Sequence, residues 1–246
     1  MKSINWKVYL GIILLILSAV VYFVHWIIFR DPHHILIYMV GDVAFVFVEV
    51  LMVTLIIHAL LEEREKKAKL EKLNMVIGLF FSEVGTELLT HSSDYDPNLN
   101  KIRKELIVTN DWDDDEFKRV HDMLRKYEFE IDPKKVKFND LKAFLSRRTD
   151  FLVRLLENPV LLEHETFTEL LRAVFHLAEE LSHREDVKKI PRSDKEHIAG
   201  DIKRAYLLLV NEWLDYMMHL KGNYPYLFSL AMRTNPFDKD ATPVVK

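Results

Sequence analysis

The sequence predicts an all-α protein: an integral membrane helical hairpin with two transmembrane helices, followed by a helical stalk and a cytosolic multi-helix bundle. Residues 1–61 hold two long apolar runs, which are typical of transmembrane helices. The rest of the chain repeats apolar residues at three- and four-residue spacing, which is typical of amphipathic helices. Only six Gly and eight Pro interrupt the 246 residues, and no segment alternates as a strand would.

The first apolar run covers residues 8–29 and contains no Asp, Glu, Lys or Arg. Its 22 residues exceed the roughly 20 that a helix needs to cross a bilayer. A signal peptide is not expected here. The apolar region of a signal peptide has only about 7–15 residues and is followed by a small-residue cleavage site, and this run is longer and has no such site after it. We therefore predict a retained transmembrane helix.

The second apolar run covers residues 35–61 and is interrupted only by Asp42, Glu49 and His58. At a rise of about 1.5 Å per residue it reaches about 40 Å, which exceeds the roughly 30 Å hydrocarbon core. The short segment 30–34 joins the two runs and contains Pro32, which cannot continue a helix. Residues 1–61 are thus predicted to form a two-span hairpin.

Basic residues near the ends of these runs predict the orientation of the hairpin. Five Lys and Arg follow the second run within residues 62–72, and Lys2 and Lys7 precede the first, whereas the joining loop holds Arg30 alone. Because cytoplasmic flanks carry the excess of Lys and Arg, both termini are predicted to be cytoplasmic and the loop at 30–34 external.

Asp42 and Glu49 are the polar feature of the hairpin that bears most on function. They are seven residues apart, so they differ by about 20° around a helix and about 10 Å along it. An acidic side chain that faces lipid at mid-membrane costs about 2.5–3.5 kcal/mol, so this stripe is expected to face protein or water. The first run offers a depth-matched polar stripe of Ser18, Tyr22 and His25.

Two roles for this stripe remain open at the level of the sequence. Tyr22 or His25 could hydrogen-bond Asp42, and Ser18 could hydrogen-bond Glu49, which would fix the packing of the hairpin or of a homo-oligomer. Alternatively, several copies could place rings of Asp42 and Glu49 around a pore, and acidic rings favour cations.

Residues 62–92 are predicted to continue the second span as a juxtamembrane stalk. Three Glu and Lys pairs at i,i+4 spacing support a helix at its start. Further along, Gly78, Ser82 and Gly85 share one helical face, which permits another helix to approach closely, either within the chain or in a second copy.

Residues 93–233 are predicted to form an all-helical cytosolic domain, and residues 234–246 a flexible tail rich in Pro, Asp and Lys. The predicted helices cover about 98–109, 113–128, 140–157, 160–183 and 194–221. A capping box from Ser193 to Glu196 opens the last of them.

Oxygen-bearing side chains in residues 94–105 follow the spacing of an EF-hand calcium loop. They are Asp94, Asp96, Asn98, Asn100 and Glu105. Two departures weaken the match: Leu99 stands where the sharp turn calls for Gly, and Pro97 stiffens the loop. The alternative to a Ca²⁺ site is a turn that leads into a helix, for which Asp and Asn are the usual residues.

A polar stripe in residues 164–183 resembles the ligand spacing of di-iron bundles, since Glu180 and His183 are three residues apart. On a helix, however, Glu169, His176, Glu180 and His183 lie within about 40° of one another and opposite the apolar face. A second such motif is missing, because residues 194–197 begin with Asp and lie in a first helical turn. We therefore expect a solvated polar face.

The charge balance of the chain and its lack of catalytic motifs limit the classes of function that the sequence supports. Residues 62–246 hold 31 of the 34 Lys and Arg and 35 of the 38 Asp and Glu, so this part of the chain is slightly acidic. Because nucleic-acid-binding domains carry an excess of basic residues, nucleic acid is not an expected partner. The chain has no cysteine, phosphate-binding loop or HExxH motif on which to base a catalytic site. We expect a non-enzymatic oligomeric membrane scaffold or sensor that presents its helical domain to a cytosolic partner. The alternatives are an oligomeric cation channel lined by the second span and, third, a membrane-tethered di-metal enzyme.

Overall fold

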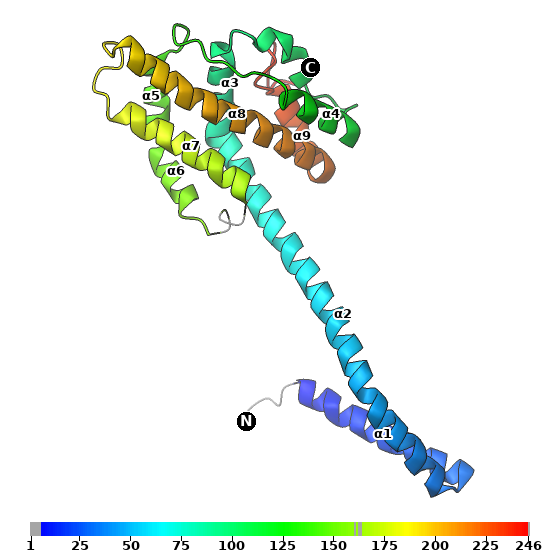
Figure 1. The fold of residues 1–246 in the computed structure, drawn as a ribbon. Coiled ribbons are helices and arrows are strands. Elements are labelled where there is room, and N and C mark those ends of the chain that lie inside the picture. The colour runs from blue at the N-terminus through cyan, green and yellow to red at the C-terminus, as the bar shows by residue number, and fades with distance from the viewer. Residues whose placement is uncertain (1–5, 160, 162–163, 246) are drawn as a thin grey trace. The chain divides into compact units, whose positions relative to one another are not determined.

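The computed structural model describes residues 6–159, 161 and 164–245 and shows helices connected by short loops (Figure 1). No strand occurs in the part of the chain that it describes, so the predicted all-α fold is confirmed. The chain divides into two compact units, Met1–Lys66 and Lys67–Lys246.

The first unit consists of α1 (Trp6–Phe29) and most of the apolar part of α2 (Pro32–Phe80). The turn between them is two residues long, shorter than the predicted segment 30–34, because Pro32 occupies the first position of α2 rather than the loop. Arg30 makes the turn with a φ of 50°. Asp31 then caps α2, since its Oδ1 accepts hydrogen bonds from the backbone N–H of His33 at 3.0 Å and of His34 at 3.3 Å.

The side chains of this unit are almost all exposed. Of those described, only His25 and Ile35 are even partly buried. By length and composition, Val8–Phe29 and part of the helical stretch Pro32–Tyr95 are long and apolar enough to cross a membrane.

The second unit begins within α2, whose Leu73, Ile77 and Phe80 are buried in its core. A single π-helical turn, η1 (Phe81–Gly85), follows and leads into α3 (Thr86–Tyr95). The later part of the predicted stalk 62–92 thus packs inside the helical domain. The ring of Phe80 meets that of Phe167 edge to face, with centroids 5.3 Å apart.

The remaining elements form a bundle in which α8 packs against α3, α4, α7 and α9, while α5 and α6 pack against α7 (Figure 1). They are η2 (Leu99–Lys101), η3 (Arg103–Leu106), α4 (Asp114–Leu124), α5 (Phe138–Ser146), α6 (Thr149–Leu156), α7 (Glu165–Ser182), α8 (Arg192–Asn223) and α9 (Pro225–Arg233).

Three elements differ from the sequence prediction. The helix expected over about 98–109 is two short 3₁₀ turns, and the one expected over about 140–157 is broken between α5 and α6. The start of α8 lies earlier than expected: Pro191 is its N-cap, so Ser193 falls inside the first turn and the predicted capping box is wrong. Proline suits this position because its φ of −63° is already close to the helical value.

The sequence predicts a flexible tail from residue 234, whereas the structure packs the start of that segment into the core. Phe237 is fully buried, and its ring meets that of Trp213 with centroids 5.2 Å apart. The amide Nδ2 of Asn235 donates a hydrogen bond to the carbonyl of Leu106 at 2.9 Å, and Arg103 donates one to the carbonyl of Phe237 at 3.0 Å.

Candidate functional site

The polar side chains of the apolar helices lie on the surface of the first unit. Asp42 and Glu49 on α2 are exposed, as are Ser18 and Tyr22 on α1. His25 is partly buried, and its ring stacks on that of His34 with centroids 6.2 Å apart. Within residues 6–66 as described, no hydrogen bond joins the two helices through these side chains, and Nδ1 of His25 is buried without a partner.

The hydrogen bonds expected between Ser18 and Glu49, and from Tyr22 or His25 to Asp42, are therefore not formed in the described part of this single chain. Two carboxylates remain on an otherwise apolar helix surface, about two helical turns apart. In an apolar environment such groups require hydrogen-bond donors or water. A single copy of the described helices does not supply those donors.

Gly78, Ser82 and Gly85 do not act as one small-residue face. An added Cβ on Gly78 would lie 3.1 Å from the Oη of Tyr216 on α8, so this glycine permits the close approach of a helix from the same chain. Ser82 is exposed, whereas Gly85 is buried beside the ring of Phe81. The π-helical turn contains both Ser82 and Gly85, and its i→i+5 pairing changes the rotation per residue on which the predicted shared face depends.

The predicted calcium loop is occupied by contacts within the protein. Both carboxyl oxygens of Asp96 accept hydrogen bonds at 2.8 Å, one from the hydroxyl of Tyr127 and one from the backbone N–H of Asn98. The amide of Asn98 donates to Glu130 at 3.1 Å, and Glu105 forms an ion pair with Arg119 at 2.5 Å. Asp94 and Asn100 are exposed.

Burial raises the pKa of the Asp96 carboxyl, although the hydrogen bond from Tyr127 opposes this shift. These residues thus form a turn and a hydrogen-bonded corner. The structure does not bring Asp94, Asp96 and Glu105 together as a group of three ligands within the described chain.

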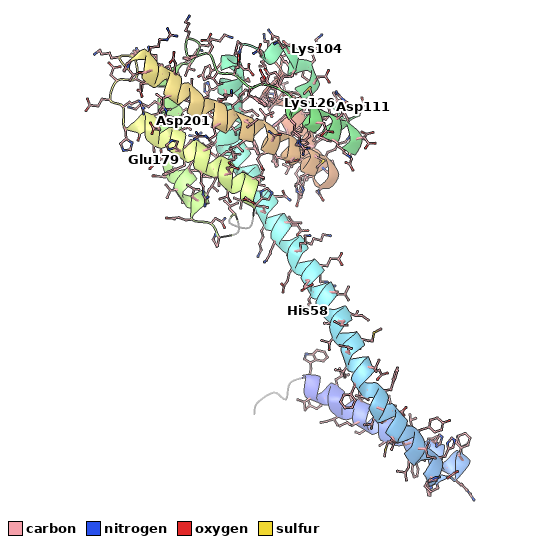
Figure 2. The ribbon with its side chains drawn as sticks, in the orientation of Figure 1. His58, Lys104, Asp111, Lys126, Glu179 and Asp201 are labelled. Atoms are coloured by element: carbon pink, nitrogen blue, oxygen red, sulfur yellow. The ribbon has the colours of Figure 1, made fainter. Side chains whose placement is uncertain are left out.

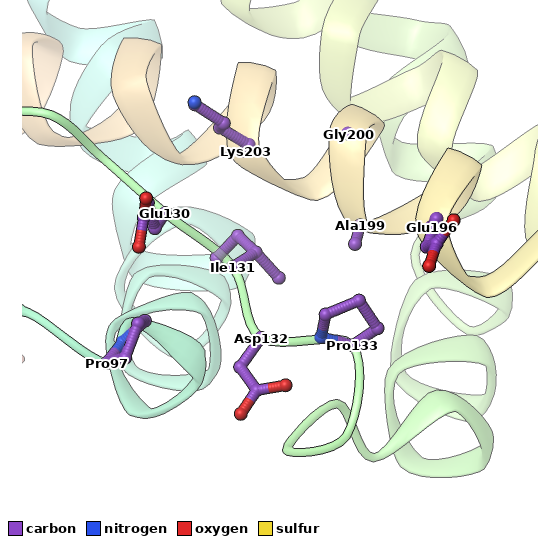
Figure 3. Close-up of a pocket in the computed structure, with 9 residues that line it drawn as sticks. All are labelled: Pro97, Glu130, Ile131, Asp132, Pro133, Glu196, Ala199, Gly200 and Lys203. Atoms are coloured by element: carbon purple, nitrogen blue, oxygen red, sulfur yellow. The ribbon is translucent and has the colours of Figure 1, made fainter. Parts of the chain in front are cut away.

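A surface groove of about 480 Å³ lies between α8 and the segment after α4 (Figure 3). Glu130, Ile131, Asp132 and Pro133 form one wall, and Glu196, Ala199, Gly200 and Lys203 of α8 form the other. Its charged side chains are Glu130, Asp132 and Glu196 with Lys203, so the groove is acidic on balance and open to solvent.

A cluster of histidines and carboxylates lies where the end of α7 meets the start of α8. Ligand atoms of Glu180, His197 and Asp201 all lie within 4.8 Å of one another, and this is the one such group among the described residues. His176 adds a second imidazole, with its Nε2 3.8 Å from Oδ2 of Asp201. Asp201 lies between α8 and α7 in Figure 2.

The sequence correctly identifies His176 and Glu180 as polar neighbours but predicts that they face solvent. In the structure α8 covers this part of the stripe only in part, so the side chains of His176 and Glu180 are 45% and 27% exposed, whereas His183 is on the surface. Asp201 is not among the residues that the sequence predicts for a site, and His197 is predicted only as part of a first-turn motif. Two histidine and carboxylate pairs at i,i+4 spacing, at 176 and 180 and at 197 and 201, are a signal that could have located the cluster.

The fold and these features define a two-part all-helical protein: a pair of exposed apolar helices, and a bundle built around α8. The chain belongs to the family of the uncharacterized protein MJ1433. Residues 2–61 match the model of its N-terminal helical domain, and residues 69–233 match the model of its C-terminal helical domain.

A relative from Methanocaldococcus jannaschii, the uncharacterized protein MJ1433, is 48% identical over 238 residues, which cover 97% of this chain and 96% of the relative. No solved structure matches the chain. The family models meet between residues 61 and 69, close to the division between the two units at Lys66 and Lys67.

Proposed function

We propose that this chain is an integral membrane protein that spans the bilayer twice, associates with copies of itself through α2, and presents its helical domain to a cytosolic partner as a scaffold or sensor. The observation that carries the proposal is the exposure of the apolar helices. In α1 and the apolar part of α2, large side chains such as Leu15 and Phe47 are 73% and 75% exposed.

An exposed apolar surface of this extent must be buried against lipid or protein to be stable. Each Å² of it costs about 25 cal/mol in water, and soluble proteins rarely leave an apolar patch of more than a few hundred Å² uncovered. A bilayer removes the cost along α1 and along most of the apolar run of α2. The lengths of the runs and the basic residues that flank them support the same arrangement.

Self-association follows from the unpaired acids. Asp42 and Glu49 lie on one stripe of α2 and have no hydrogen-bond donor within the described residues of the first unit. A second copy of the hairpin offers Ser18, Tyr22 and His25 as donors at matching depths. The cation-channel alternative uses the same stripe, but requires it to line a shared, water-filled axis.

The topology is testable because the chain has no cysteine. Single cysteines replace His33 at the start of α2, next to the turn, and Val245 near the carboxy terminus, both of which are exposed. In intact cells a membrane-impermeant maleimide should label His33→Cys, whereas Val245→Cys should react only after the membrane is permeabilised. Release of the protein by an alkaline carbonate wash, or equal labelling of both variants in intact cells, would contradict the proposal.

Self-association is tested by the mass of the purified protein in detergent. Wild type should be oligomeric, and Asp42→Asn and Glu49→Gln should shift it toward monomer, whereas the control Glu63→Gln, beyond the apolar run, should not. A monomeric wild type would exclude both self-association and the channel. Cation flux into liposomes that Glu49→Gln alters would favour the channel over the scaffold.

A further inference from the structure

The cluster between α7 and α8 is built from two matched pairs. His176 and Glu180 are one turn apart on α7, and His197 and Asp201 are one turn apart on α8. On a helix, i and i+4 side chains project from the same face. Each helix thus contributes one imidazole and one carboxylate to the same place.

The distances within the cluster are similar to one another. Nε2 of His197 lies 3.5 Å from Oδ2 of Asp201 and 3.7 Å from Oε2 of Glu180. Nε2 of His176 lies 3.8 Å from Oδ2 of Asp201 and 3.9 Å from Oε1 of Glu180. These separations exceed those of good hydrogen bonds, which are about 2.7–3.2 Å. Four ligands about 2.1 Å from a tetrahedral zinc ion are about 3.4 Å apart, so small side-chain movements would complete the shell.

Asp201 provides an independent indication of a missing cation. Its side chain is only 5% exposed, and its Oδ2 is buried without a hydrogen-bond partner. The other oxygen, Oδ1, lies 3.4 Å from Nη1 of Arg204. Buried carboxylate oxygens are nearly always satisfied, so an orphaned oxygen that points at two imidazoles and a second carboxylate requires an explanation.

Arg184 holds the second carboxylate in place. Its Nη1 donates to Oε2 of Glu180 at 2.7 Å, and its other nitrogens form a two-point contact with Asp194. Oε1 of Glu180 remains available, which is the arrangement of a metal-binding carboxylate that is oriented by a neighbouring donor.

We propose that His176, Glu180, His197 and Asp201 bind one divalent transition-metal ion between α7 and α8. Two imidazoles and two carboxylates suit Zn²⁺ best, since it accepts both ligand types in tetrahedral geometry, whereas Mg²⁺ and Ca²⁺ prefer oxygen ligands alone. The ion would join the end of α7 to the start of α8. This inference is independent of the proposed membrane function and differs from a di-metal site.

The test uses the full-length protein purified in detergent, stripped with a chelator and titrated with ZnCl₂ by calorimetry. Wild type should bind one equivalent and melt at a higher temperature when loaded. Asp201→Asn, which keeps the size of the side chain, should weaken the Kd by at least about 100-fold, because removal of a ligand should cost at least as much as the loss of an outer-shell partner.

Two further variants remain informative if Asp201→Asn does not fold. His176→Gln and His197→Gln alter side chains that are 45% and 55% exposed, so the core is not disturbed, and each should also lose zinc. The control His183→Gln removes the exposed histidine that directly follows α7 and lies outside the cluster, and it should bind as wild type does.

Three results would overturn the proposal. The first is the absence of stoichiometric zinc binding to the wild type. The second is binding that persists unchanged in His176→Gln and His197→Gln, which would place the ion elsewhere. The third is equal loss in His183→Gln, which would indicate non-specific binding to surface histidines. The visible spectrum of the cobalt-substituted protein then tests for four-coordinate geometry.

Discussion

Glu212 is a carboxylic acid in the interior of the helical domain. It lies on α8 and is only 5% exposed. Burial raises the pKa of its carboxyl, and a hydrogen bond with Thr166 and the nearby His164 counteract this shift in part. The neutral form therefore suits the folded protein better than the charged form does.

This shift predicts how stability depends on pH. Because the folded pKa lies above the unfolded value of about 4.3, the folded state binds more protons, and the stabilisation is fully present below the unfolded pKa. It is lost as the pH rises through the folded pKa. Glu212→Gln, which is always neutral, should thus melt higher than wild type at pH 7, by about 2–4 °C for each kcal/mol recovered.

The comparison requires melting curves of both proteins at pH 4 and pH 7. The difference between variant and wild type should shrink at the lower pH. A variant that is less stable than wild type at pH 7 would show that the ionised carboxylate makes a favourable contact. Glu63→Gln, an exposed site on α2, serves as the control and should change little at either pH.

At the scale of single residues, the sequence predicts which side chains share a helix face better than it predicts which side chains of other helices they contact. His176 and Glu180 were recognisable as neighbours because i,i+4 spacing depends on helix geometry alone. Their approach to Asp201 depends on how α7 and α8 are rotated against each other, which the whole core determines. The predicted start of the last long helix is also two residues late, so the prediction places His197 in the first helical turn, whereas it lies in the second turn of α8.

The π-helical turn η1 is one of the elements that the sequence does not predict, and Gly85 is its most closely packed residue. An added Cβ there would lie 2.5 Å from Cδ1 of Phe81 and 2.9 Å from Cε1 of Phe80. Both phenylalanines are buried, and the ring of Phe81 stacks on that of Tyr216 with centroids 5.2 Å apart. The rings thus have little freedom to move aside.

Gly85→Ala should therefore destabilise the helical domain despite the higher helix propensity of alanine. Overpacking of this kind costs about 1–3 kcal/mol. Gly200→Ala is the matched control, since it lies inside α8 with no atom within 4 Å of an added Cβ, and it should stabilise by about 0.5–1 kcal/mol. Denaturant titrations measure both, and a neutral or stabilising Gly85→Ala would show that the rings reorient freely.

Long, strongly periodic helices were predictable, and short elements were not. The expected helix over about 140–157 is broken after Ser146. At the break, the hydroxyl of Thr149 donates a hydrogen bond to the carbonyl of Leu145 at 3.1 Å. Arg148, at the break, donates to the carbonyl of Glu83 at 2.9 Å. This contact comes from a segment more than sixty residues away in the sequence, so no local pattern could reveal it.

At the scale of the whole molecule, the two units differ in where their apolar side chains lie: they are exposed in the first unit and mostly buried in a core in the second. Every buried apolar residue in the described chain lies between Leu73 and Phe237, and residues 6–66 contribute none. The second unit thus has a complete core that is formed by its own residues. The apolar composition of residues 1–61 is evident from the sequence, but the start of the core at Leu73 is not, because α2 continues without a break from Pro32 to Phe80.

A fragment of residues 67–246 should therefore fold without detergent and unfold in one cooperative transition. A second fragment that ends at residue 233, where the match to the family model ends, should be less stable by about 3 kcal/mol or more, since it lacks the buried ring of Phe237 and the hydrogen bond from Asn235 to Leu106. Urea denaturation followed by circular dichroism measures both. Aggregation of the longer fragment would show that the domain depends on the apolar helices, whereas equal stability of the two fragments would show that the segment after α9 contributes nothing to the core.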